Sequence, residues 1–186
     1  MSLSQVEKSL VNIEGHVVIQ DADSGEVLAK RRNAIHFENI SIALANLLAN
    51  QGAHSIVNMK YGNGGTTIDG LGAITYKSPN TDSISSELFN ETYSKSVDSA
   101  VVEHTVGNTY SDVVLTSTLD YTEPNDQDAE DTSTDLNGDY IFDEIALYSG
   151  DSNMLTHVIF HPVQKSANRK IQIVYTLRIR TTYSEV

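Results

Sequence analysis

The feature that most constrains the fold is a regular alternation within residues 170–182, close to the C-terminal end of the chain. Every second residue there is apolar, namely Ile171, Ile173, Tyr175, Leu177 and Ile179. The residues between them are Gln172, Val174, Thr176, Arg178 and Arg180. Because successive side chains of an extended chain point to opposite sides, this spacing predicts a strand with one buried face.

Two more strand-like runs precede this segment, at residues 140–148 and 155–161. Short polar links, at residues 149–153 and 162–168, separate the three runs. Links of this length suit antiparallel hairpins and are too short for a helical crossover. We therefore expect a three-stranded meander that closes the fold.

The first two thirds of the chain add further extended segments. Residues 15–20 and 26–32 flank a turn at residues 21–25, where Asp, Ser and Gly favour a hairpin. The other runs with strand character are residues 56–61, 97–106 and 112–121.

One helix is predicted near residues 39–50. Its apolar residues recur at the spacing of one helix face, and they are Ile40, Ala43, Leu44, Leu47 and Leu48. Asn39 is expected to cap the N-terminus and Gly52 to end the helix. The opposite face carries no charge, which predicts that it is covered, either by its own domain or by a neighbouring subunit.

Together these patterns predict a mainly β protein, an antiparallel β-sandwich with one α-helix and a long acidic loop at residues 122–140. We expect residues 1–14 to form an N-terminal arm and residues 15–186 a single domain. The chain has 186 residues and no cysteine, so disulfides and thiolate metal sites are excluded. No run approaches the ~20 apolar residues that cross a bilayer, and we expect no membrane partner.

Charge is distributed unevenly along the chain. Residues 82–151 hold 17 Asp or Glu and one Lys, while the whole chain has a net charge of −13. Such an acidic surface should repel nucleic acid. The expected interface residues are basic, namely Lys30, Arg31, Arg32, Arg178 and Arg180. They could meet the acidic region of another copy head to tail, whereas in the simpler alternative the acidic loops only aid solubility.

A calcium site is the sharpest metal hypothesis. Oxygen-bearing residues Asp135, Asn137, Asp139 and Asp143 follow the rhythm of a calcium loop. Two positions break it, because Tyr140 replaces the glycine of the sharp turn and Ala146 the final bidentate acid. The prediction of a strand from Tyr140 onward also argues against the loop, so the candidate is weak.

Other chemistry finds little support in the sequence. The glycine-rich residues 62–67 follow a strand, but neither a lysine nor a helix follows them as in a phosphate-binding loop. His157 and His161 are four residues apart, ~13 Å along a strand, too far to share a metal. There is no Gly-x-Ser-x-Gly elbow. We expect no cofactor and no enzymatic activity.

Several stretches resemble virion structural proteins of tailed bacteriophages, especially contractile-tailed ones. They are residues 15–28, residues 33–39 leading into the helix, residues 61–66, and residues 141–148 with residues 160–165 and the closing strand. The likeness includes an apolar strand that ends in Asp-Glu-Ile-Ala-Leu-Tyr, then a Pro-x-x-Lys turn and a final alternating strand.

The resemblance implies a non-enzymatic subunit located in the virion, with other virion proteins and further copies of itself as partners. A place at the neck, collar or tail is the leading expectation. A capsid decoration protein and a carbohydrate- or receptor-binding tail module are alternatives. The absence of Trp weakens the carbohydrate alternative, because sugar platforms favour large aromatic residues.

Overall fold

The computed structural model describes residues 8–127 and 140–184, which fold into two packed antiparallel sheets and a small hairpin. Sheet A has the order β2-β1-β12-β9-β8 and sheet B the order β3-β11-β10-β4-β7. Sheet A consists of β1 (Lys8–Asp21), β2 (Val27–Arg32), β8 (Ser99–Glu103), β9 (Tyr110–Leu119) and β12 (Ile171–Ser184). Sheet B consists of β3 (Ala34–Ile35), β4 (Ile56–Gly62), β7 (Glu91–Ser96), β10 (Ile141–Ser149) and β11 (Met154–Gln164).

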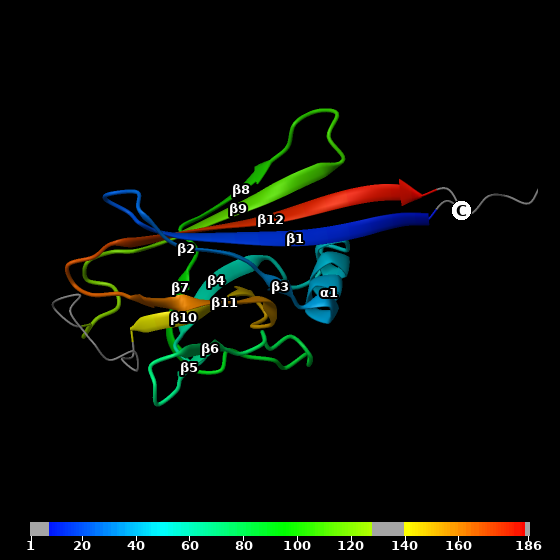
Figure 1. Cartoon of the computed structure of the whole chain (residues 1–186). Helices are drawn as coiled ribbons and strands as arrows, with labels where there is room; N and C mark the ends of the chain where they lie inside the picture. Colours follow the sequence, from blue (N-terminus) through cyan, green and yellow to red (C-terminus); the bar gives the residue numbers. More distant parts are fainter. Residues whose placement is uncertain (1–7, 128–139, 185–186) are drawn as a thin grey trace, which may run out of the picture.

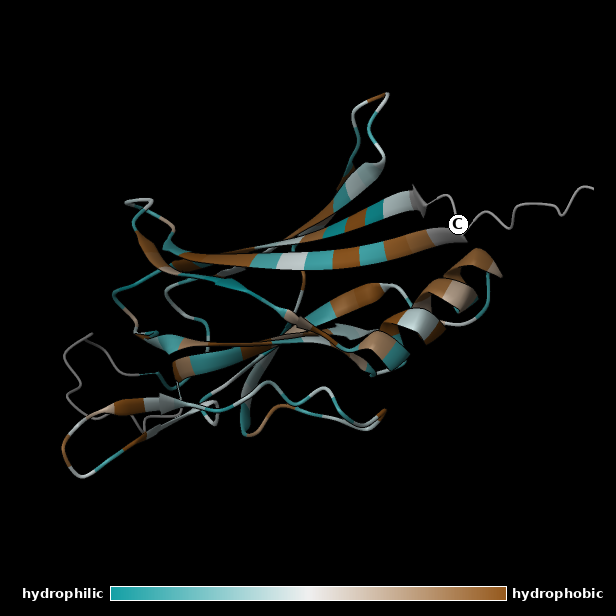
Figure 2. Cartoon of the chain, turned by 45° about the vertical axis from the view of Figure 1, so that its right-hand side comes forward, coloured by the Kyte–Doolittle hydropathy of each residue, from teal (hydrophilic) through white to brown (hydrophobic). Residues whose placement is uncertain are grey.

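The two sheets form the upper and lower layers in Figure 1. The hairpin of β5 (Thr66–Ile68) and β6 (Ile74–Tyr76) lies below sheet B. One continuous apolar core fills the space between the sheets, built from alternate residues of the strands on both sides, as the banded strands of Figure 2 show. The prediction of a mainly β, antiparallel sandwich is therefore confirmed.

Strand β12 lies at the centre of sheet A. It pairs with β1 over its whole length, from Ile171 opposite Asp21 to Ser184 opposite Lys8, and with β9 on its other side. The four core-facing residues Ile171, Ile173, Tyr175 and Leu177 are buried, as the alternation predicts. This central position explains why the pattern is the clearest in the sequence.

The predicted three-stranded meander is wrong in its last step. β10 and β11 do form an antiparallel hairpin in sheet B. β12, however, belongs to sheet A, so the link after β11 carries the chain from one layer to the other. The link length does not distinguish the two arrangements, because a link of this length can span both the ~4.8 Å between neighbouring strands and the ~10 Å between packed sheets.

The single helix, α1 (Phe37–Leu48), packs at one end of the sandwich below β1 (Figure 1). His36 caps it instead of the predicted Asn39, since His36 Nδ1 accepts a hydrogen bond from the Asn39 N–H. Ile40 and Ala43 are buried, whereas Leu47 and Leu48 near its C-terminus are exposed. Within residues 8–127 and 140–184, no helix has the length and apolar character needed to span a bilayer.

Part of the expected N-terminal arm belongs to the sheet. Residues 8–14 form the beginning of β1 and pair with residues 178–184 of β12. Residues 8–11 and 181–184, which lie beyond the last pair of β12 with β9, run past α1 as a two-stranded ribbon (Figure 1). Leu10 and Val11 on the ribbon are exposed on opposite faces. Because neither face of the ribbon is buried there, the sequence has no alternation of apolar and polar residues from which this part of the strand could be predicted.

Strand β10 is buried along its whole length. One face meets the sandwich core, and the other meets residues 63–90, which form a covering layer over sheet B. A second apolar cluster marks this contact, formed by Leu88, Ala146, Tyr148 and Met154. Sheet B is therefore covered on both sides, which sequence analysis did not predict.

Candidate functional site

The most concentrated group of buried polar side chains lies where β10 meets the covering layer. The pairing of β10 with β11 shifts register between Phe142 and Glu144, so Asp143 lies at a β-bulge where it stands opposite residues 160–162 of β11. Phe142 and Ile145 both contribute to the sandwich core. A bulge changes the alternation of side chains along a strand, which lets Asp143 and Glu144 both face the covering layer.

Asp143 binds the glycine-rich loop that follows β4. Its Oδ1 accepts a hydrogen bond from the Gly65 N–H at 2.8 Å. Its Oδ2 accepts hydrogen bonds from the Thr66 N–H at 2.7 Å and from the Thr66 hydroxyl at 2.5 Å. The carboxylate thus holds the start of β5 against sheet B.

Glu144 binds three backbone N–H groups and one histidine. Oε1 accepts from Gly64 and Asn90, at 3.1 and 2.8 Å, and Oε2 accepts from Phe89 at 3.0 Å. Oε2 also lies 3.0 Å from Nε2 of His157. Because Nδ1 of His157 accepts a hydrogen bond from the Asn80 N–H at 2.8 Å, the ring proton of the neutral form lies on Nε2 and is donated to Glu144.

The two neighbouring carboxyl groups have pKa values shifted in opposite directions. Burial raises the pKa of Asp143 in spite of the hydrogen bonds from Thr66 and Gly65. Burial acts on Glu144 in the same sense, but the hydrogen bonds from His157, Asn90 and Phe89 outweigh it and lower the pKa of Glu144. The hydrogen bonds to Glu144 therefore favour its ionised form.

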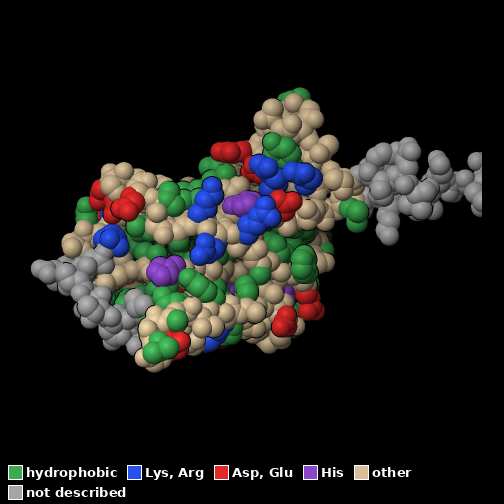
Figure 3. Space-filling view, viewed as in Figure 1, with side chains coloured by type: hydrophobic (Ala, Val, Ile, Leu, Met, Phe, Trp, Pro, Cys, Tyr) green, Lys and Arg blue, Asp and Glu red, His purple; other side chains and the backbone are tan. Residues whose placement is uncertain are grey.

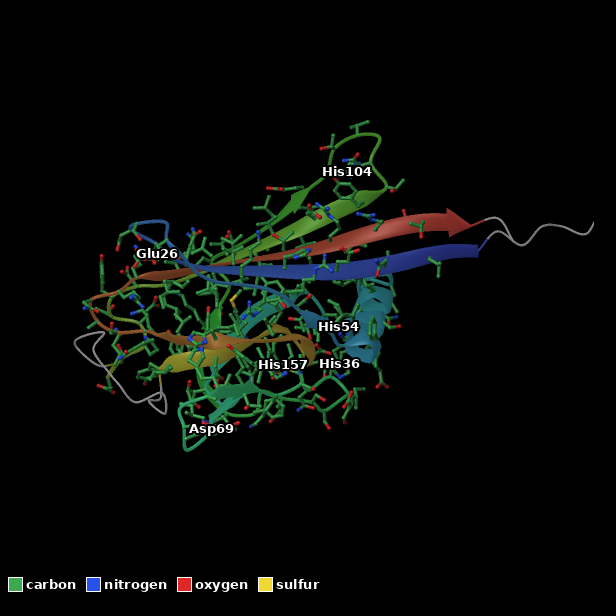
Figure 4. All side chains as sticks on the ribbon, in the orientation of Figure 1. Glu26, His36, His54, Asp69, His104 and His157 are labelled. Carbon is green, nitrogen blue, oxygen red and sulfur yellow. The ribbon has the colours of Figure 1, made fainter. Side chains whose placement is uncertain are left out.

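A second polar anchor ties the covering layer to α1. Nε2 of His36 lies 2.6 Å from the carbonyl oxygen of Ser83. The Asn39 amide donates to the carbonyl oxygens of Met154, at 2.9 Å, and Ile84, at 3.2 Å. Figure 4 shows His36 and His157 on the side of sheet B that faces the covering layer.

These buried groups anchor the covering layer. His157 and Glu144 have no exposed side-chain surface, and both ring nitrogens of His157 are engaged. Sequence analysis singled out Asp143, His157 and Asn39, each for a different role, but did not single out Glu144 or His36. One sequence signal was available, namely the two consecutive acids Asp143 and Glu144 inside an apolar strand. They could have indicated that a polar segment covers this face of the sheet.

The calcium hypothesis receives no support at Asp143, because both of its carboxylate oxygens bind the loop of Gly65 and Thr66. The other candidate ligands, Asp135, Asn137 and Asp139, lie outside the described residues. Among residues 8–127 and 140–184, no group of three or more His, Asp or Glu side chains is arranged to hold a metal ion. His157 and His161 make separate contacts, His157 with Glu144 and Asn80, and His161 Nδ1 with the Tyr76 hydroxyl at 3.2 Å.

The predicted basic residues gather on the outer face of sheet A. β2 and β12 both flank β1, and the register places Arg32 opposite His16 and Arg178 opposite Glu14. Because directly opposite residues share a face, Lys30, Arg32, Arg178 and Arg180 all lie on the side away from the core. Lys and Arg side chains crowd this region in Figure 3. Arg31 lies opposite the buried Val17 and so belongs to the reverse face.

Within this basic face, Arg178 already has a partner in its own chain. Its Nε and Nη2 donate to the two carboxylate oxygens of Asp112 at 2.8 and 2.7 Å. Its guanidinium also lies over the ring of Tyr110, 4.1 Å from the centroid. The hydrogen bond from Arg178 lowers the pKa of Asp112. The exposed residues Lys30 and Arg32 are therefore better placed than Arg178 to meet an external acid.

An open apolar pocket of about 240 Å³ lies at the end of the sandwich that holds α1. Its lining includes Leu44 and Leu47 of α1, Ile13 of β1, Val113 of β9 and Ile179 of β12. Leu47 is half exposed beside it and Leu48 is 90% exposed. This end of the molecule thus presents apolar surface of the kind found at protein–protein contacts.

Comparisons of the chain with family models, with curated proteins and with solved structures find no match. The surfaces of the chain itself are therefore the basis for a functional proposal. Two of them stand out, namely the basic face of sheet A and the apolar end with α1.

Proposed function

We propose that the chain is a non-enzymatic structural subunit of a bacteriophage virion, acting at the neck, collar or tail by assembly with further copies and other virion proteins. The main observation in support of the proposal is that basic residues from two separate segments of the chain lie on the same face of sheet A. Lys30 and Arg32 come from β2, and Arg178 and Arg180 come from β12, nearly 150 residues later.

The charge of the rest of the chain complements this face. Residues 82–151 contain 17 acids and one Lys. Asp143 and Glu144 are buried and Asp112 binds Arg178, but other acids of this stretch are exposed, among them Asp82, Glu87, Glu91 and Glu103, so one copy carries both a basic face and exposed acidic groups. A contact between unlike surfaces of identical subunits is head-to-tail, and it closes into a ring when the rotation between neighbours allows. Complementary charges in such a contact favour correct orientation and fast association.

The internal polar network supports a structural role in a different way. Its acids and histidines are used to hold the covering layer, and the oxygens of Asp143 and Glu144 bind backbone N–H groups of the same chain. Such a network gives a fixed shape to sheet B, and a fixed shape suits a repeated subunit. The sequence likeness to tailed-phage virion proteins adds the biological setting.

The test is self-association of purified protein, measured by size-exclusion chromatography with light scattering. We expect an oligomer whose population falls with added salt and falls further in Arg32→Glu. Arg31→Glu is the matched control, because it makes the same charge change at the neighbouring residue on the reverse face. A monomer under all conditions, or equal effects of the two variants, would contradict the proposed contact.

A second experiment, which locates the chain in intact virus particles, tests whether it is a virion protein. Immunogold labelling or reconstruction of a virion should place it at the neck, collar or tail. Finding it over the capsid surface would favour a decoration protein instead, and its absence from particles would reject the virion function.

A further inference from the structure

The beginning of β1 is an exposed strand edge. β12 pairs with β1 from Lys8 onward, but β2 joins the other side only from His16. Within the described residues, no strand pairs with the β2 side of residues 8–15. An unpaired edge of this length can accept another strand, and native proteins usually cover or interrupt such edges.

The backbone of this edge is oriented for pairing. The carbonyl oxygen of Gly15 accepts a hydrogen bond from the Asn33 N–H, so it points to the β2 side. In an antiparallel ladder, alternate residues direct both backbone groups to the same side. The N–H and C=O groups of Ser9, Val11 and Ile13 therefore point outward, where a second strand would bind.

The side chains at this edge are apolar and exposed. Leu10 has 52% of its surface exposed and Val11 has 59%. Ile13, two residues further on, already lines the apolar pocket beside α1. A partner strand here would cover apolar surface continuous with that pocket.

We infer that β1 of a second copy pairs with this edge, antiparallel and about a two-fold axis at Val11, which joins the two A sheets into one continuous sheet. The inference deepens the proposed assembly function and rests on it for the choice of a second copy as partner. A two-fold contact uses the same segment twice, so the segment must complement itself.

The sequence of the edge meets this requirement. With Val11 opposite Val11 of the partner copy, Ser9 stands opposite Ile13, and both belong to the set with outward-pointing backbone groups. This register also sets the lysine of the sequence at residue 8 opposite the glutamate at residue 14, at both ends of the paired segment. Opposite charges in directly opposed positions stabilise strand pairs.

The length of the edge also fits. In this register residues 8–14 of one copy pair with residues 14–8 of the other. The next position, Gly15, already uses its carbonyl oxygen with Asn33. The pairing therefore fills the open edge and stops where β1 gains its own neighbour.

Cysteine cross-linking tests this register directly, because the natural chain has no cysteine. In Val11→Cys the two new thiols would lie at directly opposite positions. Directly opposite Cα atoms in a hydrogen-bonded antiparallel pair are ~5.5 Å apart, within the ~4.4–6.8 Å range that a disulfide spans. We expect a disulfide-linked dimer under mild oxidation.

Val102→Cys is the matched control, since Val102 is an exposed valine on β8, the edge strand on the other side of sheet A. The inference requires Val11→Cys to cross-link while Val102→Cys stays a monomer on non-reducing gels. Equal cross-linking of the two, with wild type still oligomeric by light scattering, would overturn the β1 contact and leave the assembly function standing. A monomeric wild type would reject both.

Val11→Pro gives an independent test. Proline removes the N–H that points to the partner, whereas the groups that bind β12 belong to the neighbouring residues, and proline is tolerated on edge strands. We expect loss of the dimer with an unchanged circular dichroism spectrum. A folded Val11→Pro protein that dimerises like wild type would contradict the inference.

Discussion

Glu144 and His157 face each other across adjacent strands of sheet B, with Oε2 and Nε2 3.0 Å apart and neither side chain exposed. The pair links β10 to β11, and it also reaches the covering layer through Phe89, Asn90 and Asn80. The loop at Gly64, the segment at Phe89–Asn90 and strand β11 thus all contact one carboxylate.

Glu144→Gln should destabilise the protein. A glutamine amide nitrogen would replace one carboxylate oxygen and face backbone N–H groups that need an acceptor. We expect a loss of ~2–4 kcal/mol in the free energy of unfolding, measured by urea denaturation. Glu26→Gln, at an exposed turn residue, is the control and should change stability by less than ~0.5 kcal/mol. A similar small loss in both variants would show that the carboxylate is dispensable.

Gly62→Ala should also be costly, because the covering layer approaches β4 closely there. A Cβ at this position would lie 2.3 Å from the Asn90 carbonyl oxygen and 2.6 Å from Glu144 Oε1. We expect a loss of ~2 kcal/mol or more, seen as a lower midpoint in thermal melts. Gly70→Ala is the control, since nothing lies within 4 Å of its added Cβ. Equal melting temperatures of the two variants would argue against the close approach.

Lys165 should make stability depend on pH. Its side chain is buried and donates to Gln127 Oε1 and to the Ser166 carbonyl oxygen. Burial lowers the pKa of Lys165 from 10.5 to about 8. Between these values the unfolded chain binds more protons than the folded one, so the contribution of Lys165 to stability rises with pH.

Urea denaturation at pH 7.5 and pH 9.5 measures this effect. The stability of wild type relative to Lys165→Met should rise by ~1–2 kcal/mol between the two pH values. Lys30→Met, at an exposed lysine, is the control for the loss of one positive charge. If wild type and Lys165→Met respond equally to pH, the lysine titrates as it would in water.

Arg178→Lys should weaken the contact between β12 and β9. Lysine cannot reproduce the two parallel hydrogen bonds to Asp112 or the stacking on Tyr110. Both partners are partly exposed, so we expect a loss of only ~0.5–1 kcal/mol. A double-mutant cycle with Asp112→Asn measures the coupling, and strictly additive losses would mean that the ion pair adds nothing to stability.

The sandwich could be predicted from the sequence because the inner faces of its sheets require apolar residues at regular intervals along the strands. In β12 and β9, apolar residues such as Leu177 and Leu115 recur at every second position, since one side meets the core and the other meets solvent. The turn between β1 and β2 could also be predicted, because Asp21 and Gly25 are residue types that favour the backbone conformation of a turn. Asp21 Oδ1 accepts from the Ser24 N–H, and Gly25 has a φ of 75°.

The covering layer could not be predicted in the same way. Residues 63–90 are held mainly by hydrogen bonds from their backbone to Asp143, Glu144 and His157, and such bonds require no periodic side-chain pattern. The position of β12 in sheet A was missed for a related reason, since its alternation is the same whichever sheet it joins. The capping by His36 was missed because Asn39, a better intrinsic cap, stands three residues further on.

The register that sets Lys8 beside Ser184 has a practical consequence. A fusion partner joined directly before Lys8 and one joined directly after Ser184 would therefore start from the same end of sheet A. A circular permutant that links these two points and reopens the chain at the exposed β8–β9 turn, beside Val106, would keep every strand pair and move both ends to another corner.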